Sequence, residues 1–270
     1  MINHLTIKRK KMLPKISIIT VSYNQVEFIE ENILSVINQN YPNIEHIIID
    51  AGSTDGTLEI LKKYDTYLNW ISEPDNGQSD GLNKGFKKAT GEIIGWINSD
   101  DNLSKNSLNI VGEFFKNNPE EIALVGNQAI IDEKSNLLRV TKSQAYSFDY
   151  LLNHATGITQ NSTFFKKEVF GTIGYLNENL HYAMDTDLFI RIASIKNMYY
   201  IDETLAEFRI QPNAKTAEGS HKFAMELLKI RKKYGAKRFS PAVIDDIYII
   251  LSQPLRNITW LRNFVQKIRH

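Results

Sequence analysis

Short apolar segments that alternate with amphipathic segments constrain the fold of this chain more than any other feature. Residues 16–22, Ile-Ser-Ile-Ile-Thr-Val-Ser, are β-branched and nearly all apolar, which is typical of a strand buried on both faces. Apolar residues then recur at helical spacing from Val26 to Ile37, and Pro42 precedes a second strand at 44–50. This β-α-β opening predicts an α/β fold with a mostly parallel sheet flanked by helices.

The alternation continues to about residue 103. We expect helices at 57–63, 79–89 and 104–117, and strands at 68–72, 92–97, 122–131 and 137–141. Ligands of parallel sheets bind beyond the carboxyl ends of the strands, so the polar segments 20–24, 50–55 and 98–101 are expected to line a binding site.

The chain divides into three regions. A basic leader at 1–13 precedes an α/β domain at 14–215, and a helical region follows at 216–270. The last stretch, 258–270, mixes apolar and basic residues, so it either packs on its own domain or lies on an anionic membrane surface.

Composition excludes several classes of function. Of 270 residues, 42% are hydrophobic and 23% charged, and 32 basic against 31 acidic residues leave a net charge of +1, so no global field attracts nucleic acid. Cysteine is absent, which excludes disulfides, thiolate metal sites and a cysteine nucleophile. Since we find neither a membrane-spanning apolar run nor a signal-peptide core in residues 1–11, we expect a soluble, cytoplasmic protein.

Two adjacent carboxylates, Asp100 and Asp101, follow the apolar strand that ends near Ile97. Carboxylate oxygens suit a hard cation such as Mg²⁺ or Mn²⁺, which typically accompanies a phosphate-bearing substrate. The alternative is a polar turn that caps a helix beginning near Ser104.

Two further turns carry polar groups at strand ends. In 50–57, Asp50 is an acceptor for ribose hydroxyls or a base N–H, Ser53 supplies a hydroxyl, and Thr54 or Asp55 is the expected helix cap. In 72–85, Lys84 is expected to approach a phosphate and Asp80 or Asn83 a sugar hydroxyl, unless this loop is only a solvated turn capped by Ser79 or Asp80.

A fourth constellation surrounds Asp185. The apolar run 188–192 predicts a core helix, and Asp185 lies at or just before its start. Asp185 is therefore either a helix N-cap or a carboxylate facing a cleft, and the two roles are compatible. Asp187 is the second choice for the cleft, and His181 is expected to be a surface or packing residue.

Together these motifs resemble glycosyltransferase family 2, whose members share the GT-A fold. The resemblance covers about Pro14 to Pro212. It rests on the motifs at 18–24, 50–57, 72–85, 96–101 and 184–191.

The resemblance implies inverting transfer of a sugar from a nucleotide diphosphate donor, often UDP-linked, to a glycan or lipid-linked oligosaccharide in cell-surface polysaccharide biosynthesis. It divides the domain into a nucleotide-sugar-binding half, 14–103, and an acceptor-side half, 104–215. Asp185 would be the general base, and Asp100, helped by Asp101, would hold Mn²⁺ or Mg²⁺. The residues expected to bind the nucleotide-sugar are Thr20, Ser22, Tyr23, Asp50, Ser53, Asp80, Asn83, Lys84, Asn98, Ser99 and Asp100.

Three positions depart from the family's pattern. Asn98 replaces the first aspartate of the metal motif, Ala51 replaces an aspartate that meets the base of the nucleotide, and Met184 replaces the glutamate before the general base. Because of these changes, a catalytically silent nucleotide-sugar-binding subunit remains an alternative. A nucleotidyltransferase on a related fold is the other alternative.

Overall fold

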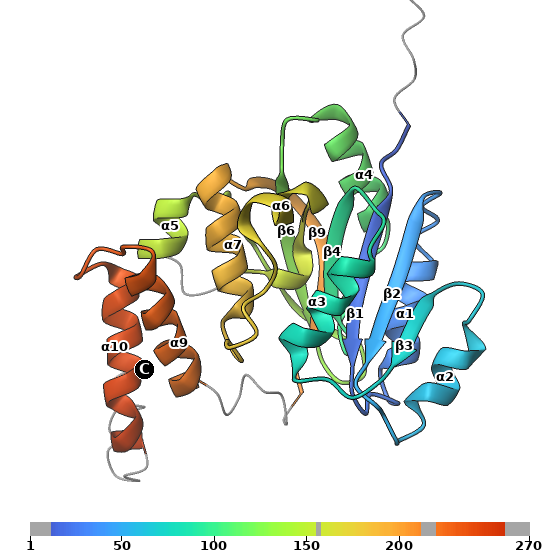
Figure 1. The fold of residues 1–270 in the computed structure, drawn as a ribbon, viewed down its shortest axis with the longest axis horizontal. Coiled ribbons are helices and arrows are strands. Elements are labelled where there is room, and N and C mark those ends of the chain that lie inside the picture. The colour runs from blue at the N-terminus through green and yellow to red at the C-terminus, as the bar shows by residue number, and fades with distance from the viewer. Residues whose placement is uncertain (1–11, 155–157, 212–219, 257–270) are drawn as a thin grey trace, which may run out of the picture.

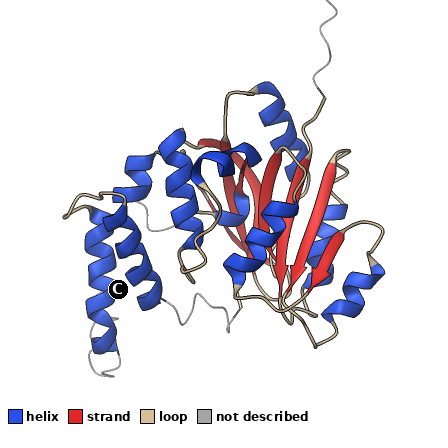
Figure 2. Ribbon diagram, in the orientation of Figure 1, coloured by secondary structure: helices blue, strands red, loops and turns tan. Residues whose placement is uncertain are grey.

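The computed structural model describes residues 12–154, 158–211 and 220–256, and every structural statement concerns these residues. A single sheet runs through the molecule with helices on both faces (Figures 1 and 2). The predicted amphipathic helix at 258–270 and the basic leader up to residue 11 lie outside the described residues.

The first half of the domain has the predicted β-α alternation. Its strands are β1 (Ile16–Ser22), β2 (Ile44–Asp50), β3 (Asn69–Ser72) and β4 (Ile93–Asn98), and its helices are α1 (Ile29–Ile37), α2 (Thr57–Lys63) and α3 (Gln78–Lys88). These strands pair in parallel in the order β3-β2-β1-β4.

The second half is more irregular. It contains β5 (Asn102–Leu103), α4 (Ser107–Asn117), β6 (Ala123–Ile131), β7 (Leu137–Thr141), α5 (Phe148–Asn153), η1 (Gln160–Ser162), β8 (Thr163–Lys166), η2 (Lys167–Val169), α6 (Phe170–Ile173), α7 (Met184–Ile195) and β9 (Tyr199–Arg209). Here β8 runs antiparallel to both β4 and β6, while β9 is parallel to β6 and antiparallel to β5. The sheet is thus parallel in its first half and mixed in its second.

The described part of the C-terminal region forms α9 (Ser220–Lys233) and α10 (Pro241–Arg256). Leu227 and Ile230 of α9 join the hydrophobic core under α7. Arg231, which is almost fully buried, donates to the carbonyls of Leu151 and Leu152 and pairs with Asp246 at 2.7 Å. The region therefore packs on the domain, and none of the described helices is long and apolar enough to cross a membrane.

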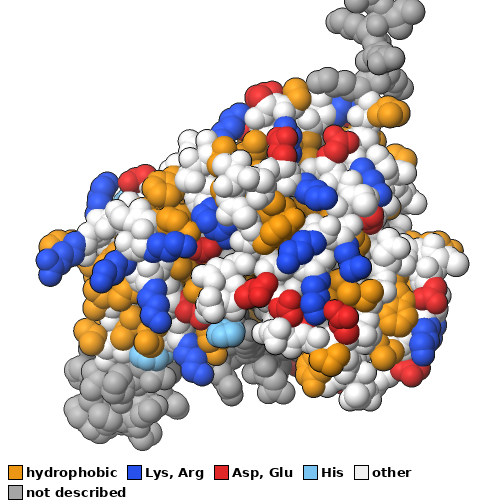
Figure 3. Space-filling view, viewed as in Figure 1, with side chains coloured by type: hydrophobic (Ala, Val, Ile, Leu, Met, Phe, Trp, Pro, Cys, Tyr) orange, Lys and Arg blue, Asp and Glu red, His pale blue; other side chains and the backbone are white. Residues whose placement is uncertain are grey.

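Period-2 alternation along the strands sorts the core onto the two faces of the sheet. On β1, Ile19 packs with Leu82 and Phe86 of α3, whereas Ile16 and Ile18 pack with residues of α1 and α4. Acidic and basic side chains are interspersed on the face shown in Figure 3, in agreement with the small net charge.

Strand register brings the predicted polar residues to one edge. Ser22 on β1 lies opposite Asp50 on β2, Asp50 lies opposite Ser72, and Val21 lies opposite Asn98 on β4. The carboxyl ends of four strands thus meet where the sequence analysis expects a binding site.

Candidate active site

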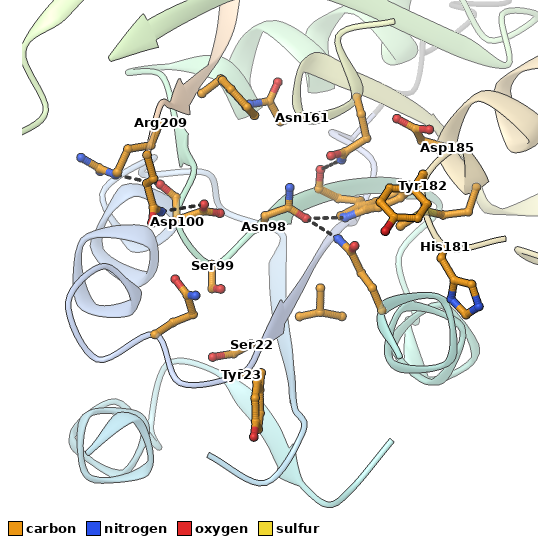
Figure 4. Close-up of a pocket in the computed structure, with 18 of the residues that line it drawn as sticks. Ser22, Tyr23, Asn98, Ser99, Asp100, Asn161, His181, Tyr182, Asp185 and Arg209 are labelled. Carbon is orange, nitrogen blue, oxygen red and sulfur yellow. Dashed lines mark hydrogen bonds between the residues drawn. The ribbon is translucent and has the colours of Figure 1, made fainter. Parts of the chain in front are cut away.

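A cavity of about 1200 Å³ opens at this edge of the sheet. Its walls come from both halves of the domain and from α9. The lining includes Ser22, Tyr23, Gln25, Gln78, Asn98, Ser99, Asp100, Gln128, Ile130, Arg139, Gln160, Asn161, His181, Tyr182, Asp185, Phe208, Arg209, Gln211 and Phe223. In Figure 4, Asp100 and Arg209 lie on one side, which we call the Asp100 end, and Asp185, Tyr182 and His181 lie on the other, the Asp185 end.

At the Asp100 end, the half-buried side chain of Asp100 lines the cavity. Its Oδ2 accepts a hydrogen bond from Gln211 Nε2 at 2.8 Å, and its main-chain oxygen accepts one from Arg209 Nε at 2.9 Å. Burial raises the pKa of Asp100 above its ordinary value, and the charge of Arg209 opposes this shift. Asp100 is therefore a half-buried carboxylate that a bound cation would stabilise in its ionised form.

Asp101 does not line the cavity, contrary to the prediction that it helps Asp100 to hold a metal. Its Oδ1 accepts from the main-chain N–H of Arg209 at 3.1 Å, and its Oδ2 accepts from Asn98 Nδ2 at 3.4 Å. Burial, and then the charge of Asp100, raise the pKa of Asp101 well above its ordinary value. The carboxyl of Asp101 thus joins β9 to the loop after β4 instead of facing the cavity.

The Asp100 end offers few protein ligands for a cation. The described chain has no cluster of three or more His, Cys, Asp or Glu side chains arranged for a metal ion. Asn98 Oδ1 already accepts from Gln78 Nε2 at 3.0 Å and from Trp96 Nε1 at 3.3 Å. Because Asp101 does not line the cavity, Asp100 supplies the carboxylate that can bind a cation at this end. Mg²⁺ often binds one or two protein carboxylates and completes its shell with substrate phosphates and water, and Asp100 suits that mode.

Within the turn 50–57, Ala51 lines the cavity, whereas the polar side chains hold the neighbouring loop. Asp50 is fully buried and accepts from the N–H groups of Gly52 and Ser53 and from the hydroxyls of Ser53 and Ser72. The side chains of the turn accept hydrogen bonds from the main-chain N–H groups of residues 24–26; these acceptors are Ser53, Thr57 and Asp55. Asp50 and Ser53, predicted as nucleotide contacts, therefore brace this loop. The N-cap position of α2 is Gly56, at φ +108°, and the carboxylate of Asp55, one of the two expected caps, accepts from the N–H of Thr57 at the start of the helix at 3.0 Å.

Helix α3 also differs from the prediction. Lys84 pairs with Glu73 at 2.9 Å and with Asp80 at 3.5 Å, and the Asp80 carboxylate also accepts from the N–H of Asn76. The side chain of Asn83 is buried. Its Nδ2 donates to the carbonyl of Leu176, and its Oδ1 accepts from the N–H of Leu176. None of the three predicted residues of α3 lines the cavity, whereas Gln78, in the first turn, does.

On β1, only the end of the strand reaches the cavity. Thr20 is fully buried, with its hydroxyl 3.0 Å from Nε2 of His46, so it does not line the cavity as predicted. Ser22 and Tyr23 do line it. Two buried polar atoms of lining residues have no hydrogen-bond partner within the described protein: Ser22 Oγ and Gln25 Oε1. Such atoms are normally satisfied, which suggests that they face a ligand or water.

Asp185 lies in the first turn of α7 and its carboxyl lines the cavity. Burial raises its pKa to about 6, although the N–H of Thr186 donates to its Oδ1 at 2.6 Å. The N-cap position is Ala183, so Asp185 is not the N-cap. A carboxyl with this pKa can accept a proton near neutral pH.

The other two candidates of this segment have different positions. Asp187 is 1% exposed and is held by Arg191 at 2.9 Å and by the hydroxyl of Tyr234 at 2.9 Å, away from the cavity. His181, expected to be a surface or packing residue, is exposed and lines the cavity.

Several lining residues were not predicted. Arg209, Gln211 and Asn161 come from the second half of the domain, and Phe223 comes from α9. Arg209 is the last residue of β9, just as Asn98 is the last residue of β4. The charged residues within 199–209 hide the apolar pattern of a strand, so the sequence did not predict a strand end, and hence a binding residue, at Arg209.

Residues 17–186 match the sequence profile described as Glycosyl transferase family 2, over more than half of the chain. The chain belongs to glycosyltransferase family 2. The resemblance inferred from the sequence motifs is thereby confirmed.

Relatives within family 2 are named as glycosyltransferases. An uncharacterized glycosyltransferase of Rickettsia typhi is 30% identical over 75% of this chain and 66% of the relative. The "Putative teichuronic acid biosynthesis glycosyltransferase TuaG" of Bacillus subtilis is 29% identical over 74% of this chain and 81% of its own length. The chain spans between 36% and 66% of the length of the first five curated relatives.

Solved structures of related folds confirm the GT-A fold. S. aureus TarS 1–349 in complex with UDP-GlcNAc has a TM-score of 0.64 at 20% identity, over 87% of this chain and 70% of that one. The mannosyltransferase PcManGT from Pyrobaculum calidifontis, in complex with GDP-Man and Mn²⁺, has a TM-score of 0.63 at 19% identity, over 90% of this chain and 72% of that one.

Proposed function

We propose that this chain is an inverting glycosyltransferase that moves a sugar from a nucleotide diphosphate donor, UDP-linked, onto a hydroxyl of a glycan or lipid-linked acceptor. The observation that carries the proposal is the placement of two carboxylates at opposite ends of one cavity. Asp185 has a pKa suited to a general base, and Asp100 suits a cation ligand. The proposal favours catalysis over a silent binding subunit because Asp185 keeps both exposure to the cavity and a suitable pKa.

Binding of the donor is supported by the cavity lining and by the neighbours. The unpartnered atoms Ser22 Oγ and Gln25 Oε1 lie at the end of β1 and in the loop after it, where the nucleotide would bind. Tyr23, 60% exposed in the same wall, offers a ring to stack on the base. TarS and PcManGT were solved with UDP-GlcNAc and GDP-Man, and the UDP preference proposed here follows the first.

The transfer needs one displacement. The carboxylate of Asp185 takes the proton from the acceptor hydroxyl while that oxygen attacks the anomeric carbon from the face opposite the nucleoside diphosphate, which departs as the new bond forms. A Mn²⁺ or Mg²⁺ ion held by Asp100 would supply charge neutralisation for the departing diphosphate. The configuration at the anomeric carbon is inverted because a single displacement occurs.

The acceptor would bind on the wall formed by β6, β7 and β9. This wall presents the apolar side chains of Ile130 and Phe208 beside Gln128 and Arg139. A mixed apolar and polar surface suits a glycan, whose sugar rings have apolar faces and polar edges. The name of the TuaG relative supports cell-surface polysaccharide biosynthesis as the process.

Peripheral membrane contact at the cytoplasmic face is also part of the proposal. The predicted amphipathic helix at 258–270 lies outside the described residues, but α10, which precedes it, exposes Ile244, Tyr248 and Leu251 by 51%, 53% and 67%. These residues share one helix face and suit a lipid surface. Deleting 258–270 and replacing Leu251 by Lys should reduce sedimentation with anionic vesicles; unchanged sedimentation would contradict this contact.

The proposed function is tested with a panel of nucleotide sugars, a glycan acceptor and Mn²⁺. We expect release of a nucleoside diphosphate that depends on the acceptor and is lost in Asp185→Asn. Release of pyrophosphate would instead indicate a nucleotidyltransferase. Tight donor binding without turnover on any acceptor would indicate a silent subunit.

A further inference from the structure

Glu226 on α9 contacts the segment that leads into α7. Its Oε1 and Oε2 accept from the N–H of His181 at 3.0 and 3.2 Å, and Oε2 also accepts from the N–H groups of Tyr182 and Ala183, both at 2.9 Å. One carboxylate thus holds three consecutive main-chain N–H groups directly before the helix that carries Asp185.

This contact satisfies the N–H of the N-cap residue of α7, Ala183, and those of the two residues before it. Helices begin with N–H groups that have no intrahelical partner, and an Asp, Asn, Ser or Thr side chain usually accepts from one of them. The N-cap of α7 is Ala183, which has no such side chain. A carboxylate near a helix N-terminus also interacts favourably with the helix dipole, so Glu226 stabilises the start of α7 in two ways.

Two neighbours of Glu226 place α9 at the Asp185 end of the cavity. Phe223, one turn earlier on α9, lines the cavity with Tyr182 and Asp185. The Lys222 ammonium lies 6.0 Å from the centroid of the Tyr182 ring. The contacts that join α9 to the segment 181–185 thus include those of Glu226 and Lys222, and Phe223 lines the same cavity.

We propose that Glu226 is a positioning residue for the transfer reaction, which fixes the segment 181–183 and thereby the carboxyl of Asp185 toward the acceptor hydroxyl. This inference rests on the proposed function of Asp185 as the general base. It makes α9 part of the catalytic apparatus, although the helix lies outside the matched family region, 17–186.

Glu226 also acts on Asp185 through charge. Its negative charge adds to burial in raising the pKa of Asp185, while hydrogen bonds from Thr186 lower it. Among the described residues, the ionisable groups at this end of the cavity include His181 and Tyr182 on the same segment and Lys222 on α9, whereas Asp187 lies away from the cavity. Neutralising Glu226 should therefore lower the pKa of Asp185.

The test compares Glu226→Gln and Glu226→Ala with Asp245→Asn, which removes an exposed carboxylate of the same helical region. For Glu226→Ala we expect kcat to fall about tenfold with donor affinity nearly unchanged, and amide hydrogen exchange at 181–183 to accelerate. For Glu226→Gln, which keeps one acceptor oxygen, we expect a smaller fall in kcat and an acid limb of the pH profile shifted to lower pH. Asp245→Asn should match the wild type in kcat, donor affinity, hydrogen exchange and pH profile.

The possible outcomes separate this inference from the proposed function. If the wild type transfers sugar and Asp185→Asn does not, but Glu226→Gln has wild-type kcat, pH profile and exchange, the positioning role is wrong and the general base stands. If Asp185→Asn remains active, the proposed function itself fails. If Glu226→Ala does not fold, the pH profile and exchange of Glu226→Gln decide.

Discussion

The two ends of the cavity both present a half-buried carboxylate, but the surroundings of these carboxylates differ. Asp100 lies beside a second carboxyl, Asp101, and near the guanidinium of Arg209. Asp185 forms no salt bridge among the described residues, and the negative charge of Glu226 adds to burial in raising its pKa. The first arrangement suits a carboxylate that binds a cation, and the second suits a carboxylate that binds a proton. The difference shows that burial alone does not define a role; the neighbouring charges do.

The largest effect should come from removing the base. Asp185→Asn keeps the size of the side chain but cannot accept the proton, so we expect transfer to fall about 10²–10⁴-fold while donor binding persists. Turnover and donor affinity, measured on the same preparation, check this prediction. Asp187→Asn is the matched control at the next carboxyl of α7; a larger loss of turnover there than in Asp185→Asn would reverse the assignment.

Removing the other carboxylate should act on the cation instead. We expect Asp100→Asn to lower transfer about 100-fold and to abolish the extra thermal stabilisation that Mn²⁺ gives to the donor complex. Asp101→Asn should retain cation-dependent stabilisation because Asp101 does not line the cavity. Loss of that dependence in Asp101→Asn alone would show that Asp101 turns toward the metal.

In the ligand-free protein, Asp100→Asn should raise the thermal stability instead of lowering it. Burial raises the pKa of Asp100 in the folded state, so its ionised form destabilises the fold at neutral pH, and this penalty disappears as pH falls through the folded pKa. We therefore expect Asp100→Asn without ligand to melt at a higher temperature than wild type at pH 7.5. The gap should narrow as pH is lowered, and a lower melting temperature at pH 7.5 would contradict the argument.

The pH profile distinguishes the two ends in the wild type. Transfer should fall below about pH 6, tenfold for each pH unit, because protonation removes the base and burial sets the pKa of Asp185 at about 6. Saturating Mn²⁺ keeps Asp100 ionised, so the limb reports the Asp185 end. A flat profile from pH 5 to 7 would remove Asp185 from the reaction or show that chemistry is not rate-limiting.

The smallest expected effects come from two hydroxyls of β1, one that lines the cavity and one that is buried behind it. Ser22→Ala removes an unpartnered hydroxyl in the cavity and should weaken donor binding about threefold to tenfold, the value of one hydrogen bond. Thr20→Val, two residues earlier, should leave donor affinity unchanged and lower stability by about 1 kcal/mol, because its partner is His46. Calorimetry of nucleotide binding and denaturant unfolding measure the two quantities; equal affinity losses would place both hydroxyls at the ligand.

The sequence by itself determined the parallel first half of the sheet and the edge that carries the site. Apolar β-branched runs and helical periodicity are local signals, and the carboxyl ends of parallel strands must meet at one edge. For this reason Ser22, Tyr23, Asn98, Ser99, Asp100 and Asp185 were all correctly expected to lie around one cavity.

Only the tertiary structure decided which polar side chains face the cavity and which brace it. Asp50, Ser53 and Asn83 have the same residue types as binding groups, but their partners are backbone groups close by in the turn or distant in the chain. The same holds for Glu226, whose partners lie 43 to 45 residues away and could not be inferred from local spacing. Hydrogen bonds between segments depend on how the helices pack, and no periodicity in the chain encodes that packing.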